Sequence, residues 1–391
     1  MKNKELLLVP GPTPVVDEIY DALASETRGH TDPRFVATFK RAIDNTKKLF
    51  QTDGEVYIVA GSGTLAMEMA LVNTVARGER LLVISHGFFG DRFTPLAQAF
   101  GIEVDVLQAA WGEHIDLALV EQALSEKAYK AVTITHADTS TGVASVLESL
   151  IPLIKAAGAL AIVDGVVATA AMQEDMSKAY GGNEQYKIDI VLTGSQKAIG
   201  IPPGLALIAF SQQALAAREQ MENVPAYYAD IHNWRPIMNN PAMYFATPPV
   251  NLIYALDVAL NIVLDEGMPE REARHIAFGK AVRAALRTYG MTPLAREEVA
   301  APTLSCILYP EGVDDAKFRA SLANEGVIVA GALAHLAGKA FRIGHMGNAT
   351  AAMLEQAVSC IGQALQEQGM NVNIEEALQA FSEQIGSFAR S

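Results

Sequence analysis

Between Glu55 and about Phe210, short apolar runs alternate with amphipathic stretches, and this alternation constrains the fold more than any other feature of the chain. Such a pattern is typical of strands and helices that follow one another to build a mainly parallel sheet. We therefore predict an α/β fold around a large seven-stranded sheet. Its expected strands are Val56–Val59, Leu81–Ser85, Glu103–Leu107, Ala131–Thr135, Ala159–Val163, Ile188–Thr193 and Leu205–Ala209.

A second, smaller unit is expected beyond this alternation. A polar, proline-bearing stretch at 239–249 interrupts it, and a long helical pattern follows over Val250–Asp265. The helical and strand-like segments after Gly267 indicate a smaller α+β domain. We predict a large domain with its limits at 21–255 and a C-terminal domain at 256–391.

The N-terminal segment is predicted to behave differently from the rest of the chain. Prolines at 10, 12 and 14 remove amide donors and fix the backbone, so the first fifty residues cannot form one regular element. We expect these residues to wrap over another part of the molecule. Residues 1–20 are assigned to an N-terminal arm.

The composition bounds the partners and the location of the protein. The formal net charge of −14 argues against general affinity for nucleic acid or for anionic membranes, because both require a basic surface. No apolar run approaches the ~18 residues of a membrane span, and the N-terminal run from Leu6 to Val9 is too short for a signal peptide. We expect a cytoplasmic protein.

The only two cysteines, Cys306 and Cys360, are not at metal-ligand spacing. Cys306 lies in the apolar run 304–308, and Cys360 lies in the helical pattern 353–365. Free cysteines in such patterns are usually core residues. We predict that both are buried and that the protein has no metal site.

Lys197 lies at the end of the apolar strand 188–193 and before the stiff Pro202-Pro203-Gly204 turn. Burial there would lower the pKa of the amine and keep it nucleophilic, as a Schiff base with an aldehyde cofactor requires. Pyridoxal phosphate is the obvious aldehyde. Taken alone, the motif is weak, because most lysines beside strands are solvated.

Two further motifs lie where expected strands end. Gly61-Ser62-Gly63-Thr64 joins a strand to a helix, and its small residues let backbone N–H groups approach a phosphate, although an ordinary tight turn is the alternative. Asp164 ends a buried strand at the edge where open α/β sheets bind ligands. An aspartate there can keep a pyridinium nitrogen protonated, or it can simply cap the next turn.

Together these motifs resemble the class V, fold type I pyridoxal phosphate aminotransferases of the alanine:glyoxylate and serine:pyruvate group. The resemblance covers nearly the whole chain and implies the fold of that family. It implies ping-pong transfer of an amino group from alanine or serine to glyoxylate or pyruvate. The matching segments are Leu7–Pro14, Gly61–Thr64, Gly87–Arg92, Ser140–Val143, Val163–Asp164, Gly194–Lys197, Pro202–Gly204, Tyr244–Thr247 and Phe341–Gly344.

The resemblance also implies roles for individual residues. Lys197 bonds the cofactor and moves the proton between the substrate Cα and the cofactor C4′, while Asp164 pairs with the pyridine nitrogen. Phe89 stacks on the ring. The other cofactor-binding residues that it implies are Ser62, Gly63, Thr64, Ser140, Gln196, Tyr244 and Thr247.

The resemblance implies a homodimer with shared active sites, because Tyr244 and Thr247 match residues that the family donates from the neighbouring subunit. Arg342 matches the arginine that grips the substrate carboxylate through two parallel hydrogen bonds. Gly11, His30 and Ser140 are the other expected substrate-binding residues.

Some positions depart from the family pattern. The best-known relatives carry His where this chain has Thr64, and relatives often carry serines within the segment 165–169. Ureidoglycine-using relatives have glutamine at the position of His30. The open alternatives are another donor (aspartate, 2-aminoethylphosphonate or ureidoglycine), a lyase or cysteine desulfurase, and a non-catalytic protein that binds a phosphorylated metabolite.

Overall fold

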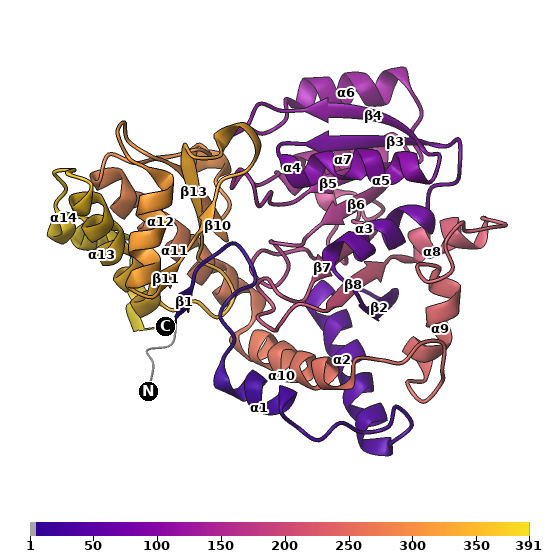
Figure 1. Cartoon of the computed structure of the whole chain (residues 1–391). Coiled ribbons are helices and arrows are strands. Elements are labelled where there is room, and N and C mark those ends of the chain that lie inside the picture. Colours follow the sequence, from indigo (N-terminus) through magenta and orange to yellow (C-terminus); the bar gives the residue numbers. More distant parts are fainter. Residues whose placement is uncertain (1–4, 391) are drawn as a thin grey trace.

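A seven-stranded sheet forms the centre of the larger part of the molecule (Figure 1). The computed structural model describes residues 5–390, so residues 1–4 of the expected arm and Ser391 lie outside it. The strand order is β2-β8-β7-β6-β5-β3-β4, and β8 alone runs antiparallel to its neighbours. The strands are β2 (Glu55–Ala60), β3 (Arg80–Ser85), β4 (Glu103–Gln108), β5 (Ala131–Thr135), β6 (Leu160–Asp164), β7 (Ile190–Gly194) and β8 (Leu205–Phe210).

The sheet confirms the predicted α/β fold, and its central strands explain why the sequence pattern was clear. Every residue of β5, β6, β7 and β8 is buried. Strands covered on both faces read as continuous apolar runs instead of alternating ones. The helices of this part are α1 (Asp17–Leu23), α2 (Pro33–Phe50), α3 (Gly63–Val72), α4 (Phe88–Asp91), α5 (Phe93–Ala99), α6 (Leu117–Glu126), α7 (Leu147–Ala156), α8 (Gln212–Glu219), α9 (Ile231–Asn239) and α10 (Val250–Glu266).

Helix α2 corrects the expectation that the first fifty residues wrap over the molecule. It is a regular helix of 18 residues that packs on α10. Asp32 caps it by accepting a hydrogen bond from the Arg34 amide, and Pro33 occupies the first turn, where its missing amide costs nothing. Only the segment before α1 has the extended course that the prolines predicted.

The C-terminal part is a smaller α+β unit, as predicted. Its antiparallel sheet has the order β12-β13-β10-β9. The strands are β9 (Thr292–Pro293), β10 (Leu304–Leu308), β12 (Ala330–Gly331) and β13 (Ala340–Gly344). The helices are α11 (Met268–Thr288), α12 (Asp315–Asn324), α13 (Ala351–Glu367) and α14 (Ile374–Ile385), and the short 3-10 helices of the whole chain are η1 (Tyr180–Gly182), η2 (Glu297–Val299), η3 (Ala334–Leu336) and η4 (Gly386–Arg390).

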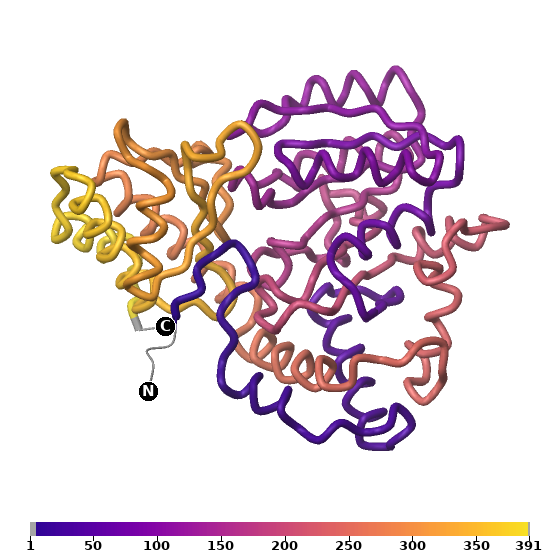
Figure 2. The backbone as a smooth tube through the Cα atoms, viewed as in Figure 1, coloured from indigo at the N-terminus to yellow at the C-terminus, as the bar shows by residue number. Residues whose placement is uncertain are grey.

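The N-terminal segment connects the two parts (Figure 2). Strand β1 (Leu6–Leu7) pairs in parallel with β11 (Val327–Ile328) of the smaller unit, and the chain then crosses to α1 beside α10. The side chain of Leu8 belongs to the smaller core, whereas the apolar side chains of α10 belong to the larger one. The limits 1–20, 21–255 and 256–391 stay a prediction.

Two general properties bear on partners. Within residues 5–390, no helix has both the length and the apolar character needed to cross a bilayer. The same residues hold no group of three or more His, Cys, Asp or Glu side chains placed to bind a metal ion. The cytoplasmic location stays a prediction.

Candidate active site

A cavity of about 210 Å³ lies where β5, β6 and β7 end, at the carboxyl edge of the sheet. This is the edge at which open α/β sheets bind ligands. A larger cleft of about 720 Å³ lies along the N-terminal segment and does not include the predicted catalytic residues. The smaller cavity is lined by Ser62, Gly63, Thr64, Met67, Phe89, Arg92, Thr135, Ala137, Thr139, Asp164, Val166, Gln196 and Lys197.

Lys197 follows β7 and places its amine in this cavity. Its Nζ donates a hydrogen bond to the backbone oxygen of Pro10. Burial, and after it the charge of Arg342, lower the pKa of this amine, whereas Asp164 raises it, and the net value is about 8. About a tenth of the amine is therefore unprotonated at pH 7, far more than for an ordinary lysine, and this fraction can act as a nucleophile.

The N-terminal segment lies directly against this lysine. Thr13 donates a hydrogen bond of 2.7 Å to the Lys197 backbone oxygen. Gly11 has a φ of +100°, and a Cβ built on it would overlap Cδ and Nζ of Lys197. Glycine at position 11 thus leaves the room that the lysine side chain occupies.

Gly11→Ala is expected to weaken cofactor binding about tenfold or more, because the added methyl displaces the Lys197 side chain and overpacking costs about 1–3 kcal/mol. The measurement is a titration of the cofactor-free protein with pyridoxal phosphate, followed by absorbance. Gly78→Ala is the matched control, since Gly78 has a φ of +82° but open space around the added Cβ. Equal affinities of the two variants would contradict the assigned role of Gly11.

Asp164 ends β6 with a side chain that is 2% exposed. Its Oδ1 accepts a hydrogen bond of 3.0 Å from the Val166 amide. Burial, helped by the negative charges of Asp138 and Glu174, raises the pKa of this carboxyl to about 7, although the hydrogen bond from Val166 and the charge of Arg92 lower it. A positively charged partner in the cavity, such as a protonated ring nitrogen, would stabilise the charged carboxylate.

The amino end of α3 lines the opposite part of the cavity. The helix begins at Gly63, and no side-chain cap from Ser62 is found among the described residues. The buried Oε1 of Gln196 also lacks a hydrogen-bond partner in the described structure. An amide can turn so that its N–H₂ group donates instead. Free amide donors and a helix N-terminus together suit a phosphate group.

Arg92 adds a positive charge to this end of the cavity. Its Nη1 donates a hydrogen bond of 3.1 Å to Oγ1 of Thr64, and its guanidinium carbon lies 4.8 Å from the centre of the Phe89 ring. The sequence prediction did not include Arg92 among the site residues. It follows Phe89 by three residues within the Gly87–Arg92 motif, so the helical spacing could have indicated it.

Phe89 lines the cavity, and a buried carboxylate holds its backbone. The amide of Phe89 donates a hydrogen bond of 3.0 Å to Oδ2 of Asp138. Ser140 donates to Oδ1 of the same residue at 2.5 Å and accepts a hydrogen bond of 2.9 Å from the Phe88 amide. Ser140 therefore braces the loop, and its neighbour Thr139 is the residue that lines the cavity.

Arg342 reaches the site from β13 of the smaller unit. Its Nε donates a hydrogen bond of 3.0 Å to the Gly331 oxygen, and its Nη1 donates one of 3.2 Å to the Thr139 oxygen. Its charge acts on the pKa of Lys197. The guanidinium is thus held beside the cavity by backbone oxygens from both parts of the molecule.

Tyr244, Thr247 and His30 form a separate group. The Tyr244 hydroxyl lies 3.4 Å from Oγ1 of Thr247, and its ring centre lies 5.3 Å from that of His30. Tyr244 is 62% exposed, and none of the three belongs to the cavity lining of the described chain. Their assignment to a shared site stays a prediction.

The segment 165–169, where relatives often carry serines, makes its polar contacts through other residues in this chain. A Cβ at Gly165 would overlap the Thr169 hydroxyl and the Glu174 carboxylate, so a serine does not fit there. The Thr169 hydroxyl donates to Glu174, which also accepts a hydrogen bond of 2.8 Å from Nδ1 of His136. Buried polar contacts therefore support this turn from residues that the sequence prediction did not name.

Comparison with known proteins gives a consistent result. Residues 12–342 match the family Aminotransferase class-V. The chain is 37% identical over 371 residues to an uncharacterized aminotransferase of Methanocaldococcus jannaschii, with 94% of each chain covered. It is 34% identical to the serine–glyoxylate aminotransferase of Methylorubrum extorquens, covering 94% of this chain and 92% of that one. The crystal structure of pyridoxamine-pyruvate aminotransferase from Mesorhizobium loti has a TM-score of 0.90 at 27% identity and covers 98% of this chain and 97% of that one.

Proposed function

Because this chain belongs to the class-V aminotransferase family, we propose that it moves an amino group from alanine or serine to glyoxylate or pyruvate, with pyridoxal 5′-phosphate as cofactor. The observation that carries the proposal is the convergence of the Lys197 amine, the Asp164 carboxylate and the amino end of α3 in one cavity. The name of the serine–glyoxylate relative supports a small donor.

The residues of the cavity suit the three groups of pyridoxal phosphate that a protein must bind, which are the phosphate, the ring nitrogen and the aldehyde. The α3 N-terminus, Gln196 and Arg92 would hold the phosphate; the buried Oε1 of Gln196 has no partner within residues 5–390, so this amide can turn and donate from its N–H₂ group. Asp164 would pair with the ring nitrogen. When bound, the cofactor supplies an aldehyde that bonds amines and a ring that accepts electrons.

Different residues of the chain would transfer the proton, bind the substrate and hold the ring nitrogen. Lys197, partly unprotonated because its pKa is about 8, would hold the cofactor and, once freed by substrate, would carry at Nζ the proton taken from the substrate Cα. Arg342 binds and orients the substrate carboxylate. Asp164 holds the proton on the ring nitrogen, and the backbone of residues 10–13 covers the lysine from solvent.

The donor is tested by a panel of alanine, serine, aspartate, 2-aminoethylphosphonate and ureidoglycine, each offered with glyoxylate, pyruvate and 2-oxoglutarate. We expect the highest kcat/KM with alanine or serine and glyoxylate or pyruvate. Turnover confined to one of the other donors would overturn the proposed substrate and leave the transaminase chemistry in place. No change in the visible spectrum on adding any amino acid would favour a protein that only binds a metabolite.

A cysteine desulfurase needs a mobile nucleophilic cysteine, and no observation favours one here. Cys306 and Cys360 are both buried, as predicted. Burial raises the pKa of the Cys306 thiol to about 12, which keeps it protonated near neutral pH. Sulfide release from cysteine without an acceptor oxo acid would contradict the transaminase proposal.

We propose further that the protein is a homodimer in which Tyr244 and Thr247 complete the partner's site, which their exposure and separation from the cavity of their own chain support. Mixing Lys197→Ala subunits with Tyr244→Ala/Thr247→Ala subunits is expected to restore about a quarter of the wild-type rate. About half of the dimers are then mixed, and each has one intact site. The measurement is the rate before and after unfolding and joint refolding.

Mixing Lys197→Ala with Asp164→Ala subunits is the matched control for this complementation. Both residues line one cavity of the same chain, so every site in the mixture has a defect and no activity should return. An absence of recovery in the first mixture, with mixed dimers present, would place Tyr244 and Thr247 outside the partner's site.

A further inference from the structure

Arg271, in the first turn of α11, is one of the largest fully buried side chains of the described residues, at 1% exposed. Its Nε donates a hydrogen bond of 2.6 Å to the Ala170 oxygen, and its Nη2 donates one of 2.8 Å to the Ala198 oxygen. Its Nη1 pairs with Glu266 at 2.5 Å. One guanidinium thus joins the end of α10 to two loops of the large sheet.

These two loops carry the residues at the centre of the proposed chemistry. Ala198 directly follows Lys197, and Ala170 lies in the turn that leads away from Asp164. Ala170 has a φ of +66°, which is unfavourable for a residue with a Cβ and persists only where the surroundings enforce it. The hydrogen bond from Arg271 is one such constraint.

The same helix ties a third loop to the lysine. Arg274 pairs with Glu266 at 2.6 Å and donates a hydrogen bond of 3.2 Å to the Gly347 oxygen. The Gly347 amide in turn donates to Nε2 of His275 at 2.9 Å. A Cβ at Gly347 would lie 3.3 Å from the Lys197 oxygen, so this loop is in close contact with the lysine backbone.

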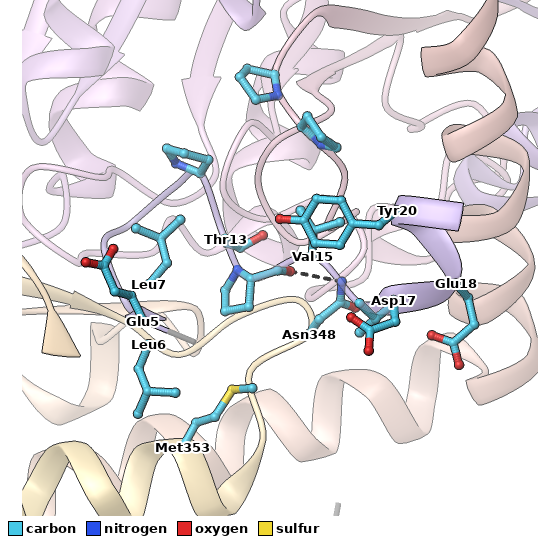
Figure 3. Close-up of a pocket in the computed structure, with 15 residues that line it drawn as sticks. Glu5, Leu6, Leu7, Thr13, Val15, Asp17, Glu18, Tyr20, Asn348 and Met353 are labelled. Carbon is cyan, nitrogen blue, oxygen red and sulfur yellow. Dashed lines mark hydrogen bonds between the residues drawn. The ribbon is translucent and has the colours of Figure 1, made fainter. Parts of the chain in front are cut away.

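The loop after Lys197 is also held from its other side by Asn348, which lines the larger cleft along the N-terminal segment (Figure 3). Asn348 donates hydrogen bonds from Nδ2 to the Gly200 oxygen at 3.2 Å and to the Pro14 oxygen at 3.1 Å. The backbone of Lys197 is therefore enclosed by the N-terminal segment, the loop before α13 and the guanidinium of Arg271. Of these, Arg271 is the one that, within residues 5–390, also donates a hydrogen bond to the loop after Asp164.

We propose that Arg271 is a positioning residue that fixes the loops after Lys197 and Asp164 against each other and keeps the lysine amine buried in the cavity. The inference rests on the proposed function, because the position of Lys197 matters only if this lysine is catalytic. The arrangement of the two loops around Arg271 nevertheless does not depend on bound cofactor. Loss of the guanidinium would free the Ala198 oxygen, move the loop and let water reach Nζ.

The alternative is that Arg271 only stabilises the fold, and Arg218 of α8 provides the matched comparison. Its buried guanidinium pairs with Asp230 at 2.9 Å and donates a hydrogen bond of 3.3 Å to the Met221 oxygen. It resembles Arg271 in burial, in its carboxylate partner and in its bond to a backbone oxygen. Within residues 5–390, its hydrogen-bond and ion-pair partners do not include either loop of the site.

The test follows the acylation of Lys197 by acetic anhydride in the full-length protein freed of cofactor, measured by peptide mass spectrometry from about pH 6 to about pH 11. The wild-type midpoint is expected near the pKa of about 8, which burial, Arg342 and Asp164 set. In Arg271→Met, hydration of Nζ should raise the midpoint by about one unit or more, so labelling at pH 8 falls severalfold. Arg218→Met should be less stable, with an unchanged midpoint.

An unchanged midpoint in a folded but destabilised Arg271→Met protein would overturn the proposal. If that variant does not fold, Arg271→Lys decides the question, because a single ammonium group cannot serve both loops: a raised midpoint supports the proposal and an unchanged one overturns it. The assay uses neither cofactor nor substrate. Failure of the proposed reaction would instead appear as absence of transamination by the wild-type protein.

Discussion

Replacing Lys197 by alanine is expected to lower kcat by about 10⁴-fold or more while the fold remains intact, because the same amine acts as nucleophile and as proton carrier. The Nζ donates to a backbone oxygen, and burial opposes its charge. Removing a buried amine that lacks a bonded carboxylate should leave the free energy of unfolding unchanged or raise it. The measurements are kcat with alanine and glyoxylate, the visible band of the bound cofactor, and chemical denaturation.

Lys155 of α7 is the matched control. It is also buried, but its Nζ pairs with Asp189 at 2.5 Å and donates a hydrogen bond of 2.9 Å to Gln213. Lys155→Ala should lose about 3–5 kcal/mol of stability and keep its turnover, since it leaves the Asp189 carboxylate buried and unpaired. If Lys197→Ala behaved in the same way, Lys197 would be a structural lysine.

Replacing Arg342 by alanine is expected to raise KM for the amino donor by about 100-fold or more, because losing one partner of a buried, hydrogen-bonded charge pair costs about 2–5 kcal/mol. The backbone oxygens of Gly331 and Thr139 orient this guanidinium. The measurement is kcat and KM for alanine in the first half-reaction, compared with an amine that has no carboxylate. Wild type should strongly prefer alanine, and the variant should lose most of that preference.

Arg319→Ala is the control for this prediction. Arg319 lies on α12 of the same unit, and its side chain pairs with Asp315 at 2.7 Å. Unlike Arg342, which donates a hydrogen bond to the cavity residue Thr139, Arg319 has no hydrogen bond to a cavity residue within residues 5–390, so its loss should leave KM within about twofold of wild type. A normal preference for alanine in Arg342→Ala would show that another group binds the carboxylate.

The large sheet could be predicted because its central strands are buried on both faces, and each of them therefore has a continuous apolar sequence. Strands β5 to β8 differ from the expected limits by at most two residues at either end. Helix α2 was not predicted, because the prolines at 10, 12 and 14 indicate irregular structure only in the segment where they occur. The helix-start signal, Asp32 followed by Pro33, lies well after that segment. Motifs at strand ends likewise predicted the family, which the comparisons confirm.

The site was less predictable where the packing of distant segments determines which side chains face the cavity. Strand ends placed Asp164 and Lys197 in one cavity, because parallel strands bring their carboxyl ends to one edge. Which of the neighbours Thr139 and Ser140 faces the cavity depends on a turn held by Asp138, and no local pattern shows this. The positioning role of Arg271 could not have been found either, since the two contacts that carry it are to backbone oxygens far away in the sequence.

The parallel pairing of β1 with β11 bears on when the protein can become active. The segment that covers Lys197 precedes the large sheet in the sequence, but the strand that anchors it, residues 327–328, follows that sheet and is made after it. Domains generally fold in the order of their synthesis. The large sheet can therefore form while the reactive amine is still uncovered, and a chain that stops before residue 327 lacks the strand that holds its own N-terminus over the lysine. The surroundings of the lysine are thus completed only after the smaller unit has been made as far as this strand.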